Sequence, residues 1–424
     1  MSESLEVWLD VDFLGDRVKV GTLAHDKGQV RFKYDREWLE HSLSFALDPH
    51  LTLDAAPFFP NPKTGNFGIF LDSSPDRWGQ TLMQRREVIE ARDEGRKPRT
   101  LYAWDYLIGV QDLTRQGALR FKREGDTPFL ADSTLSAPPV ARLAELEAVA
   151  RELTSRKIDD LDALKRWLAV LVAPGSSLGG ARPKANFTEA DGSLWIAKFP
   201  SKDDVRDVGA WEMLTHRLAI DAGIDMPQAR MLDFGGEYHT YCVKRFDRHE
   251  GRRVFYASAM TMLRREDSEG ASYLDLAQFL MANGSRTFIK QDLEQLFRRV
   301  VFNIAVGNRD DHLRNHGFLM TKDGWRLAPA FDVNPNLDKA VHVLNIDDRD
   351  NHPSLENALA TVELYELTKD RAIEVTEEVI EAVSPWISVA RKFQIANADI
   401  HAMETAFLTD EMGNLLERYR LAPN

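Results

Sequence analysis

Five residues whose side chains could carry out chemistry lie close together in the last third of the chain. Asn308, Asp310, His312 and Asn315 fall within one short polar stretch, and Asp332 follows a little later. A carboxylate can accept a proton from a hydroxyl group, whereas an amide oxygen and a second carboxylate are hard oxygen ligands of the kind that Mg²⁺ prefers. Together these groups could activate a hydroxyl and hold magnesium against nucleotide phosphates, which is the chemistry of phosphoryl transfer.

The spacing of these residues is similar to that of the protein-kinase signature. In that signature a catalytic-loop Asp precedes an Asn by five positions, and a metal-holding Asp lies beyond a short hairpin. Here Asn315 follows Asp310 by five positions, and two strand-like runs, 317–321 and 325–328, come before Asp332. This order of apolar helix, polar loop, hairpin and acid is the main clue to function.

Composition and charge exclude several classes of protein. The chain has 424 residues, 43% apolar and 29% charged, which is typical of a soluble globular protein with room for two or three domains. Its net charge of −13 argues against a broad phosphate-binding surface. The single cysteine, Cys242, excludes an intramolecular disulfide and a cysteine-based zinc site. No basic segment precedes an apolar one at the N-terminus, and no apolar run reaches about 18 residues. We therefore expect a cytoplasmic protein with no membrane partner.

The N-terminal part of the chain has the pattern of a small sheet followed by a helix. Residues 4–34 alternate between apolar and polar in three strand-like runs, and a helix is expected from Ser74-Pro75-Asp76 to about residue 93. A short strand is expected at 117–121. The composition then shifts towards Gly, Asp, Thr, Ser and Pro over 124–139, which indicates a linker.

A glycine pair in the middle of the chain could approach a phosphate. After a helical stretch that begins at Pro139 and stops at Pro174-Gly175, the loop 176–184 contains Gly179 and Gly180 and leads into strands 185–188 and 194–199. Glycines let backbone N–H groups come close to a phosphate. A plain tight turn is the alternative interpretation.

Lys198 and Glu212 form a second candidate pair. Lys198 ends a strand between apolar neighbours, where an inward-facing ammonium needs a negative partner such as a nucleotide phosphate. Glu212 lies on a helix expected over 204–222, near its apolar stripe. It could pair with Lys198 as in kinases, or it could be a solvated helix residue; the sequence leaves both open.

The next hairpin stands where a kinase would place its hinge. Strands are expected over 229–234 and 238–246, and the second ends in Lys244-Arg245-Phe246. Most of the remaining chain is expected to be helical, over 273–282, 289–306, 358–367, 371–383, 387–393 and 399–419.

With these residues in place, the sequence resembles the HipA family, the kinase toxins of bacterial HipBA toxin–antitoxin modules. The resemblance covers nearly the whole chain, and it depends on the joint order and spacing of several motifs. These are Ser74-Pro75-Asp76-Arg77-Trp78-Gly79, the loop Ser177 to Lys184, Val243-Lys244-Arg245-Phe246-Asp247-Arg248, Asn308-x-Asp310-x-His312-x-x-Asn315, and Phe331-Asp332.

The resemblance implies roles for these residues. Asp310 would be the catalytic base towards a serine or threonine hydroxyl, with Asn315 and Asp332 as Mg²⁺ ligands. Ser177, or alternatively Ser176, would be autophosphorylated, which would switch the kinase off. The implied ATP-binding set is Gly179, Gly180, Ala181, Lys184, Lys198, Lys244, Phe246, His312, Asn315, Phe331, Asp332 and Asn334.

The resemblance also implies an architecture and partners. The fold would be α+β and bilobal, protein-kinase-like, with a β-rich subdomain over 1–125, a small lobe over 126–246 and a helical large lobe over 247–424. The partner would be a small helix-turn-helix antitoxin similar to HipB, and the substrate a translation component of the aminoacyl-tRNA synthetase class. Because the chain is acidic, it would reach operator DNA chiefly through the antitoxin.

The same polar loop is also compatible with two other functions. One is a small-molecule kinase of the aminoglycoside-phosphotransferase type, which would need neither the N-terminal 120 residues nor the Ser177 loop. The other is a catalytically degenerate kinase that serves as a nucleotide-binding corepressor.

Three further polar residues have more ordinary interpretations. We expect Asp311 to be solvated and Asn308 to cap the loop. Asp247 could orient the hinge or form a surface salt bridge with Arg245 or Arg248.

Overall fold

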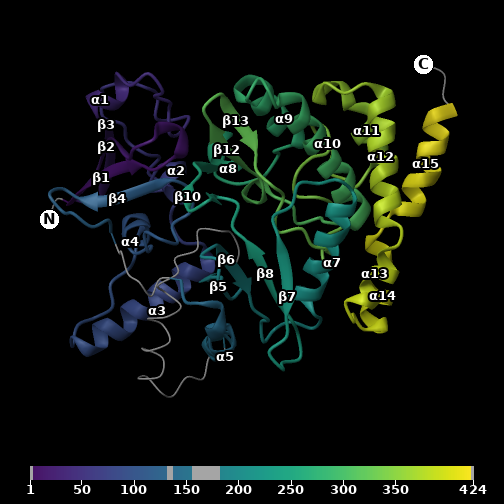
Figure 1. The fold of residues 1–424 in the computed structure, drawn as a ribbon, viewed down its shortest axis with the longest axis horizontal. Coiled ribbons are helices and arrows are strands. Elements are labelled where there is room, and N and C mark those ends of the chain that lie inside the picture. Colours follow the sequence, from purple (N-terminus) through teal and green to yellow (C-terminus); the bar gives the residue numbers. More distant parts are fainter. Residues whose placement is uncertain (1–2, 131–136, 155–181, 422–424) are drawn as a thin grey trace. The chain divides into compact units, whose positions relative to one another are not determined.

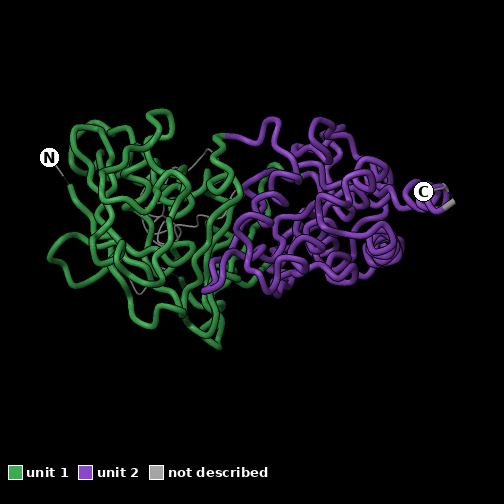
Figure 2. The backbone as a smooth tube through the Cα atoms, turned by 90° about the horizontal axis from the view of Figure 1, so that it is seen from above, with its two compact units in different colours: residues 1–204, 242–266 green, residues 205–241, 267–424 purple. Residues whose placement is uncertain are grey.

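The computed structural model describes residues 3–130, 137–154 and 182–421. The chain divides into two compact units, one formed by Met1–Asp204 and Cys242–Glu266 and the other by Val205–Tyr241 and Asp267–Asn424 (Figure 2). Each unit is therefore formed by two separate segments of the chain, which alternate along the sequence. The three sequence segments assigned above as domains remain a prediction.

The first unit begins with an antiparallel sheet of order β3-β2-β1-β4 (Figure 1). Its strands are β1 (Glu3–Leu9), β2 (Val18–Asp26), β3 (Gln29–Tyr34) and β4 (Leu119–Arg123). In β3, Val30, Phe32 and Tyr34 are buried, whereas the residues between them are exposed. The period-two pattern of the sequence therefore predicted these strands correctly.

Helices complete the first unit. They are α1 (Arg36–Leu39), α2 (Gly68–Asp72), α3 (Arg77–Asp93), α4 (Ala103–Ile108), α5 (Leu143–Thr154) and α8 (Ala259–Met262), with 3₁₀ turns η1 (Asp12–Leu14) and η2 (Val140–Arg142). The expected start of α3 is confirmed, because the Asp76 carboxylate accepts a hydrogen bond from the Gly79 amide at 2.8 Å. The helical stretch expected from Pro139 to Pro174 is described only as η2 and α5.

A second sheet has the strand order β5-β6-β8-β7. Its members are β5 (Lys184–Thr188), β6 (Leu194–Lys198), β7 (Ala229–Leu232) and β8 (Thr240–Lys244), and the boundary between the two units falls within β8. β8 is shorter than expected, because the chain turns at Phe246 and Asp247 into the short pair β9 (Arg248–His249) and β10 (Arg252–Arg253). Strand β11 (Tyr256–Ser258) follows.

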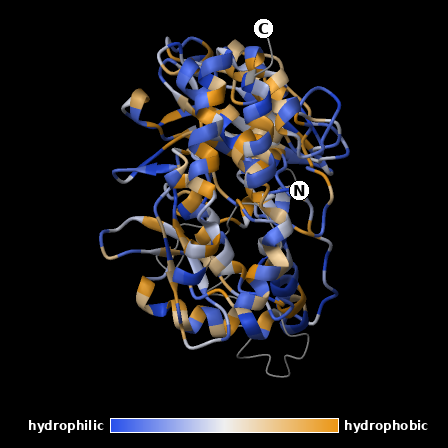
Figure 3. Cartoon of the chain, turned by 90° about the vertical axis from the view of Figure 1, so that its right-hand side faces the viewer, coloured by the Kyte–Doolittle hydropathy of each residue, from blue (hydrophilic) through white to orange (hydrophobic). Residues whose placement is uncertain are grey.

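The second unit contains β7, the start of β8, the hairpin β12 (Gly317–Thr321) and β13 (Gly324–Leu327), and many helices. Its helices are α7 (Val208–Asp221), α9 (Tyr273–Asn283), α10 (Ile289–Val306), α11 (Leu355–Ala360), α12 (Lys369–Val383), α13 (Trp386–Lys392), α14 (Asn397–Met403) and α15 (Thr409–Leu421), with 3₁₀ turns η3 (Leu313–Asn315), η4 (Val362–Tyr365) and η5 (Glu404–Ala406). Figure 3 shows hydrophobic and hydrophilic residues alternating around these helices, as expected where one face covers a core.

The prediction of one helix over 399–419 was wrong. The chain forms α14 and α15 instead, with Phe407 in an extended conformation between them. The Phe407 ring stacks on that of Trp386, with centroids 4.0 Å apart and planes 3° from parallel. Burial of this aromatic pair outweighs continuation of the helix. No helix among the described residues is both long and apolar enough to cross a membrane.

Candidate active site

A glycine ends α10 and starts the polar loop. Gly307 adopts a left-handed conformation with φ of 66°, and a Cβ at this position would lie 2.6 Å from the Ala406 carbonyl oxygen. Only glycine satisfies both requirements without strain. The Gly307 carbonyl also accepts a hydrogen bond from the Asn336 amide at 2.9 Å, which ties the start of the loop to the segment that follows Asp332.

Asp310 and Asn315 lie on the same loop with different exposures. The Asp310 side chain is 53% exposed and forms an ion pair with the Lys339 ammonium. Asn315 is 6% exposed, and its amide nitrogen lies 3.4 Å from the Asp310 carbonyl oxygen. The loop therefore holds a carboxylate that solvent or a substrate can reach, beside a carboxamide that is fixed in place.

The residue next to the candidate base is buried, and the expectation that Asp311 is solvated was wrong. One of its carboxylate oxygens lies 2.6 Å from the Tyr273 hydroxyl, 2.8 Å from the Asn303 amide nitrogen and 2.7 Å from His316 Nε2. Burial alone would raise the pKa of Asp311, but His316 and Tyr273 hold that pKa below its usual range. Asp311 therefore fixes the loop from inside while Asp310 faces outwards.

Two further residues complete this buried anchor. Asn308 donates a side-chain hydrogen bond to the Asn303 side chain at 3.0 Å, and its backbone amide donates to the Asn303 carbonyl at 2.9 Å. Asn308 thus ties the start of the loop to α10, whereas the C-cap of α10 itself is Gly307, so the capping role expected for Asn308 stays a prediction. Sequence reasoning missed Tyr273 and Asn303, because nothing in the loop motif indicates partners on α9 and α10.

The segment carrying Asp332 has an unusual backbone. Asp332 has a φ of 58°, a left-handed conformation that is uncommon for residues other than glycine but more accessible to Asp than to most. The neighbouring Val333 carbonyl accepts a hydrogen bond from the Thr215 hydroxyl of α7 at 2.6 Å. Phe331 and Asn315 line the same small cavity, so the structure brings the loop and this segment together.

The side chains of the polar loop and of the segment around Asp332 fit the expected Mg²⁺. Among the residues described, no group of three or more His, Cys, Asp and Glu side chains could hold a metal. Mg²⁺, however, usually takes one or two protein oxygens and completes its shell with water and phosphate. Asn315 and Asp332 supply an amide and a carboxylate oxygen. The buried Asn334 Oδ1, which has no hydrogen-bond partner, adds another acceptor in the same segment. His312 Nδ1 is likewise buried without a partner.

A buried histidine beside Thr215 makes stability depend on pH. His216 on α7 contacts the Tyr241 hydroxyl through Nδ1 at 3.0 Å, and burial lowers the pKa of His216 to about 4. In the unfolded chain the pKa is about 6.5. The unfolded state therefore binds the proton more readily than the folded state. The contribution of neutral His216 to the free energy of unfolding should be fully present above about pH 6.5. It should decrease towards about pH 4 by up to about 1.4 kcal/mol per pH unit.

Urea unfolding at several pH values tests this expectation with wild type and His216→Gln. The variant should show a shallower fall in this window. Part of the slope should remain, because burial also lowers the pKa of His342 to about 4. An unchanged slope would show that His216 does not titrate in this range.

Lys198 lies in the first unit, at the end of β6. It is half-buried, and its neighbours Ala197 and Phe199 are fully buried. Glu212, in the second unit, is 4% exposed, which excludes the solvated alternative for that residue. Its pairing with Lys198 remains a prediction.

The structure gives Lys184 a different partner from the phosphate that the resemblance implied. Its ammonium lies 2.6 Å from the Asp76 carboxylate, and both side chains are 2% exposed. The Lys184 carbonyl accepts a hydrogen bond from the Trp78 indole at 3.1 Å. The charge of Lys184 is thus neutralised inside the first unit, and the motif around Asp76 holds the start of β5.

The proposed hinge is tied to the N-terminal part by buried charges. The Asp247 carboxylate accepts hydrogen bonds from Arg245 at 2.6 and 2.8 Å, from Arg248 at 2.8 Å and from the Gly117 amide at 2.8 Å. Asp247 is 3% exposed, so its pairing with Arg245 and Arg248 is confirmed but does not lie on the surface. Burial by itself would raise the pKa of Asp247, yet the two arginines lower it.

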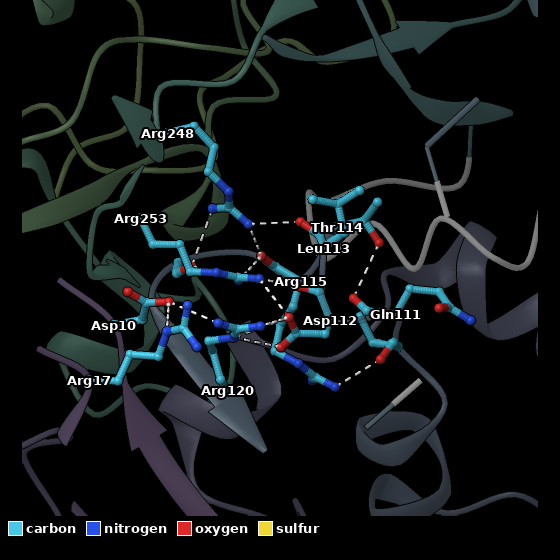
Figure 4. A network of polar contacts seen from close by, with 12 residues as sticks. Asp10, Arg17, Gln111, Asp112, Leu113, Thr114, Arg115, Arg120, Arg248 and Arg253 are labelled. Atoms are coloured by element: carbon cyan, nitrogen blue, oxygen red, sulfur yellow. Dashed lines mark hydrogen bonds and ion pairs between the residues drawn. The ribbon is translucent and has the colours of Figure 1, made fainter. Parts of the chain in front are cut away.

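A second buried acid, Asp112, extends this network (Figure 4). We call Asp247, Asp112 and the arginines that bind them the clamp. Asp112 accepts hydrogen bonds from Arg120 and Arg253 at 3.1 Å, while Arg253 also donates to the Asp112 carbonyl at 2.6 Å. Arg248 donates to the carbonyls of Leu113 and Arg115 at 3.0 and 2.7 Å. These contacts fasten the chain after β8 to the loop before β4. Lys244 and Phe246, the expected adenine contacts, are half-buried next to this clamp.

Some of the expected site residues fall outside the part of the chain that the structure describes. Ser176, Ser177, Gly179, Gly180 and Ala181 lie outside the described residues. Among the others, Lys184, Lys198, Lys244 and Phe246 belong to the first unit, whereas His312, Asn315, Phe331, Asp332, Asn334 and the candidate base Asp310 belong to the second.

Two family models match the sequence. One, described as the HipA N-terminal domain, covers residues 8–96, and the other, described as the HipA-like C-terminal domain, covers residues 176–387, which is half of the chain.

Three relatives with curated names are named as kinases. The serine/threonine-protein kinase toxin HipA of Shewanella oneidensis is 26% identical over 190 residues, 38% of this chain and 43% of the toxin. Two others carry provisional kinase names. A Haemophilus influenzae protein is 26% identical over 181 residues, 37% of this chain and 52% of that protein. Y4mE of Sinorhizobium fredii is 24% identical over 356 residues, 78% of this chain and 76% of its own length. The matches to the first two thus span about half of each relative.

A solved structure establishes the fold class. The chain resembles the Shewanella oneidensis toxin–antitoxin complex of HipA, HipB and operator DNA, with a TM-score of 0.65 and 19% identity, over 98% of this chain and 97% of the matched chain. This likeness confirms the predicted α+β fold.

Proposed function

The chain belongs to the HipA-like family, and from this premise we propose that it is an ATP- and Mg²⁺-dependent serine/threonine protein kinase that acts as a toxin. The observation that carries the proposal is the loop after α10. It exposes Asp310 and buries Asp311 in a network that fixes the loop. A kinase needs this separation, because the base must reach a substrate hydroxyl from a rigid position.

Each residue then has a defined task. The Asp310 carboxylate, steadied by Lys339, accepts the proton of the substrate hydroxyl. The hydroxyl oxygen forms a bond to the γ-phosphorus, and the bond from that phosphorus to the β–γ bridging oxygen breaks, so that ADP leaves with the electron pair. Asn315 and Asp332 hold Mg²⁺, which offsets the negative charge of the phosphates when it is bound. Lys198 binds phosphate, and the backbone from Lys244 to Phe246 binds adenine.

Autophosphorylation of Ser177 would switch this kinase off. A phosphoserine carries about −1.5 to −2 charge, and the loop that contains Ser177 is the proposed cover of the nucleotide phosphates. The two anionic groups would repel each other, so that modification of Ser177 and nucleotide binding exclude one another.

Mass spectrometry of the purified protein after incubation with Mg-ATP tests the proposal. We expect a gain of one phosphoryl group, located on Ser177 by phosphopeptide sequencing. Ser177→Ala should gain none, whereas Ser176→Ala, the matched control, should behave as wild type. ATP binding without any gain of phosphate would contradict autophosphorylation and favour the nucleotide-binding corepressor.

The proposed partners follow from the same family membership. The solved Shewanella HipA structure contains HipB and operator DNA. We extend this to a helix-turn-helix antitoxin for the present chain, which, with a net charge of −13, would meet DNA chiefly through that antitoxin. The substrate would be a translation component of the aminoacyl-tRNA synthetase class, and the site of action the cytoplasm. Co-purification with the antitoxin and operator binding by the pair, but not by the chain alone, would support this.

A further inference from the structure

A cavity of about 330 Å³ lies in the second unit, apart from the residues assigned to nucleotide and magnesium. The loop after α7 (Gly223 to Asp225), α10 from Gln291 to Arg299, and strand β13 form its walls; Figure 1 labels these elements. Its volume is at the lower end of the range for sites that bind small molecules. Its size therefore suits a compact metabolite rather than a macromolecule.

A buried arginine without a directly hydrogen-bonded acid lines this cavity. Arg299 is 4% exposed, donates a hydrogen bond to the Ala328 carbonyl at 2.7 Å, and has an Nε without a partner. No carboxylate among the described residues is within hydrogen-bond distance of it. Burial lowers the pKa of Arg299 to about 10, so the group remains charged at neutral pH. Asp225, Asp311 and Asp292 lie near enough to act on this charge, but none of them forms a hydrogen bond with it. The guanidinium therefore still has donors for an anionic ligand.

The other buried pair in the cavity neutralises itself. Arg326 donates two hydrogen bonds to the Asp292 carboxylate, at 2.8 and 2.9 Å, and the Leu327 amide adds a third at 3.1 Å. This ion pair leaves neither group in need of a ligand. Of the groups that line the cavity, Arg299 and one further acid remain without a direct ion pair.

That acid is Asp225, which lies on the exposed rim of the cavity. In the part of the chain that the structure describes, its hydrogen bonds run through the main chain. Its amide donates to the Gln295 side chain at 3.0 Å, and its carbonyl accepts from the Ala330 amide at 2.9 Å. Its carboxylate acts on the charge of Arg299 without a hydrogen bond to it, so that a cationic group could still bind there. The apolar side chains of Ile224 and Leu327 line the cavity as well.

We propose that this cavity binds a free α-amino acid with an uncharged side chain. The carboxylate of the amino acid would bind Arg299, its ammonium would bind Asp225, and its side chain would pack against Ile224 and Leu327. Arginine presents a planar fork of donors that matches a carboxylate. A zwitterion complements the buried positive and the exposed negative charge together, whereas a simple anion or amine would complement only one.

Occupation of this site would act on the segment that carries Asp332, and this step rests on the proposed function. Arg299 holds the Ala328 carbonyl, and the Asp225 carbonyl holds the Ala330 amide. Both hydrogen bonds reach the chain just before Asp332. An amino acid that fixes Arg299 and Asp225 would therefore steady the metal-binding segment, and amino-acid supply would regulate phosphoryl transfer.

Calorimetric titration of the full chain without nucleotide tests the site directly. The probes are the uncharged L-amino acids, one at a time, together with the methyl ester and the desamino analogue of any that binds. We expect at least one amino acid to bind and to raise the unfolding temperature. The ester and the desamino analogue should each bind about tenfold more weakly, because each lacks one charge of the zwitterion. Absence of binding by every amino acid would overturn the proposal.

Substitutions at the proposed site test where the amino acid binds. Asp225→Asn changes an exposed side chain and should weaken amino-acid binding about tenfold, as expected for the loss of one ion pair. Asp323→Asn, on the exposed β12–β13 turn, is the matched control and should bind as wild type. Arg299→Lys should also weaken binding, since it removes the fork but keeps the charge. Unchanged binding by Asp225→Asn would overturn the assignment. Because binding is measured without ATP, binding without kinase activity would overturn the proposed function and leave this site standing.

Discussion

Replacing Asp310 with Asn should lower the rate of phosphoryl transfer about 10²- to 10⁴-fold, the usual contribution of a positioned general base. The substitution keeps the shape of the side chain but removes the group that accepts the proton. Folding should be nearly unaffected, because Asp310 is 53% exposed and its ion pair with Lys339 lies at the surface, where such pairs contribute about 0–1 kcal/mol. ATP binding should also persist, since Asn315, Asp332 and Lys198 are intact.

The measurement is transfer of labelled phosphate from ATP to Ser177 by wild type and Asp310→Asn. Nucleotide binding and thermal unfolding of the same samples show that the variant is folded. Asp323→Asn, again an exposed Asp changed to Asn, should retain wild-type activity. If Asp310→Asn transferred phosphate as fast as this control, Asp310 would not be the base.

The second large effect concerns the clamp behind the proposed hinge. Asp247→Ala should lower the free energy of unfolding by about 3–5 kcal/mol, because it leaves the buried Arg245 and the adjoining Arg248 without their common carboxylate. The Gly117 amide would lose its acceptor as well. Since Arg245 and Arg248 lower the pKa of Asp247 despite its burial, the carboxylate is ionised at neutral pH, and its contribution is lost only when the pH falls below the usual range of an aspartate.

Urea unfolding of wild type, Asp247→Ala and Glu40→Ala measures this effect. Glu40 pairs with Arg36 across one helical turn, and the two side chains are 63% and 89% exposed, so its removal should cost less than about 0.5 kcal/mol. The two variants remove the same kind of ion pair and differ in burial. Equal costs would contradict the view that Asp247 holds the first unit together. A weaker ATP affinity of Asp247→Ala in native conditions would further connect the clamp with the hinge.

The sequence by itself determined the features that depend on neighbouring residues. The alternation in β3, the start of α3 at Asp76 and the hairpin after Asn315 follow from local periodicity, capping and turn chemistry, and the structure confirms them. The order and spacing of the loop motifs were also sufficient to predict the family that the comparisons establish. The roles of Asp310, Asn315 and Asp332 in catalysis remain predictions.

Only the tertiary structure decided which charged residues are buried and what they contact. Asp311 and Asp310 are adjacent in sequence, yet Tyr273 and Asn303 bury the first and leave the second exposed. Lys184 pairs with an acid 108 residues away, and Asp247 accepts from an amide 130 residues away. The physical reason is common to these cases. The cost of burying a charge depends on the partner that folding brings to it, and such a partner leaves no trace in the local sequence pattern.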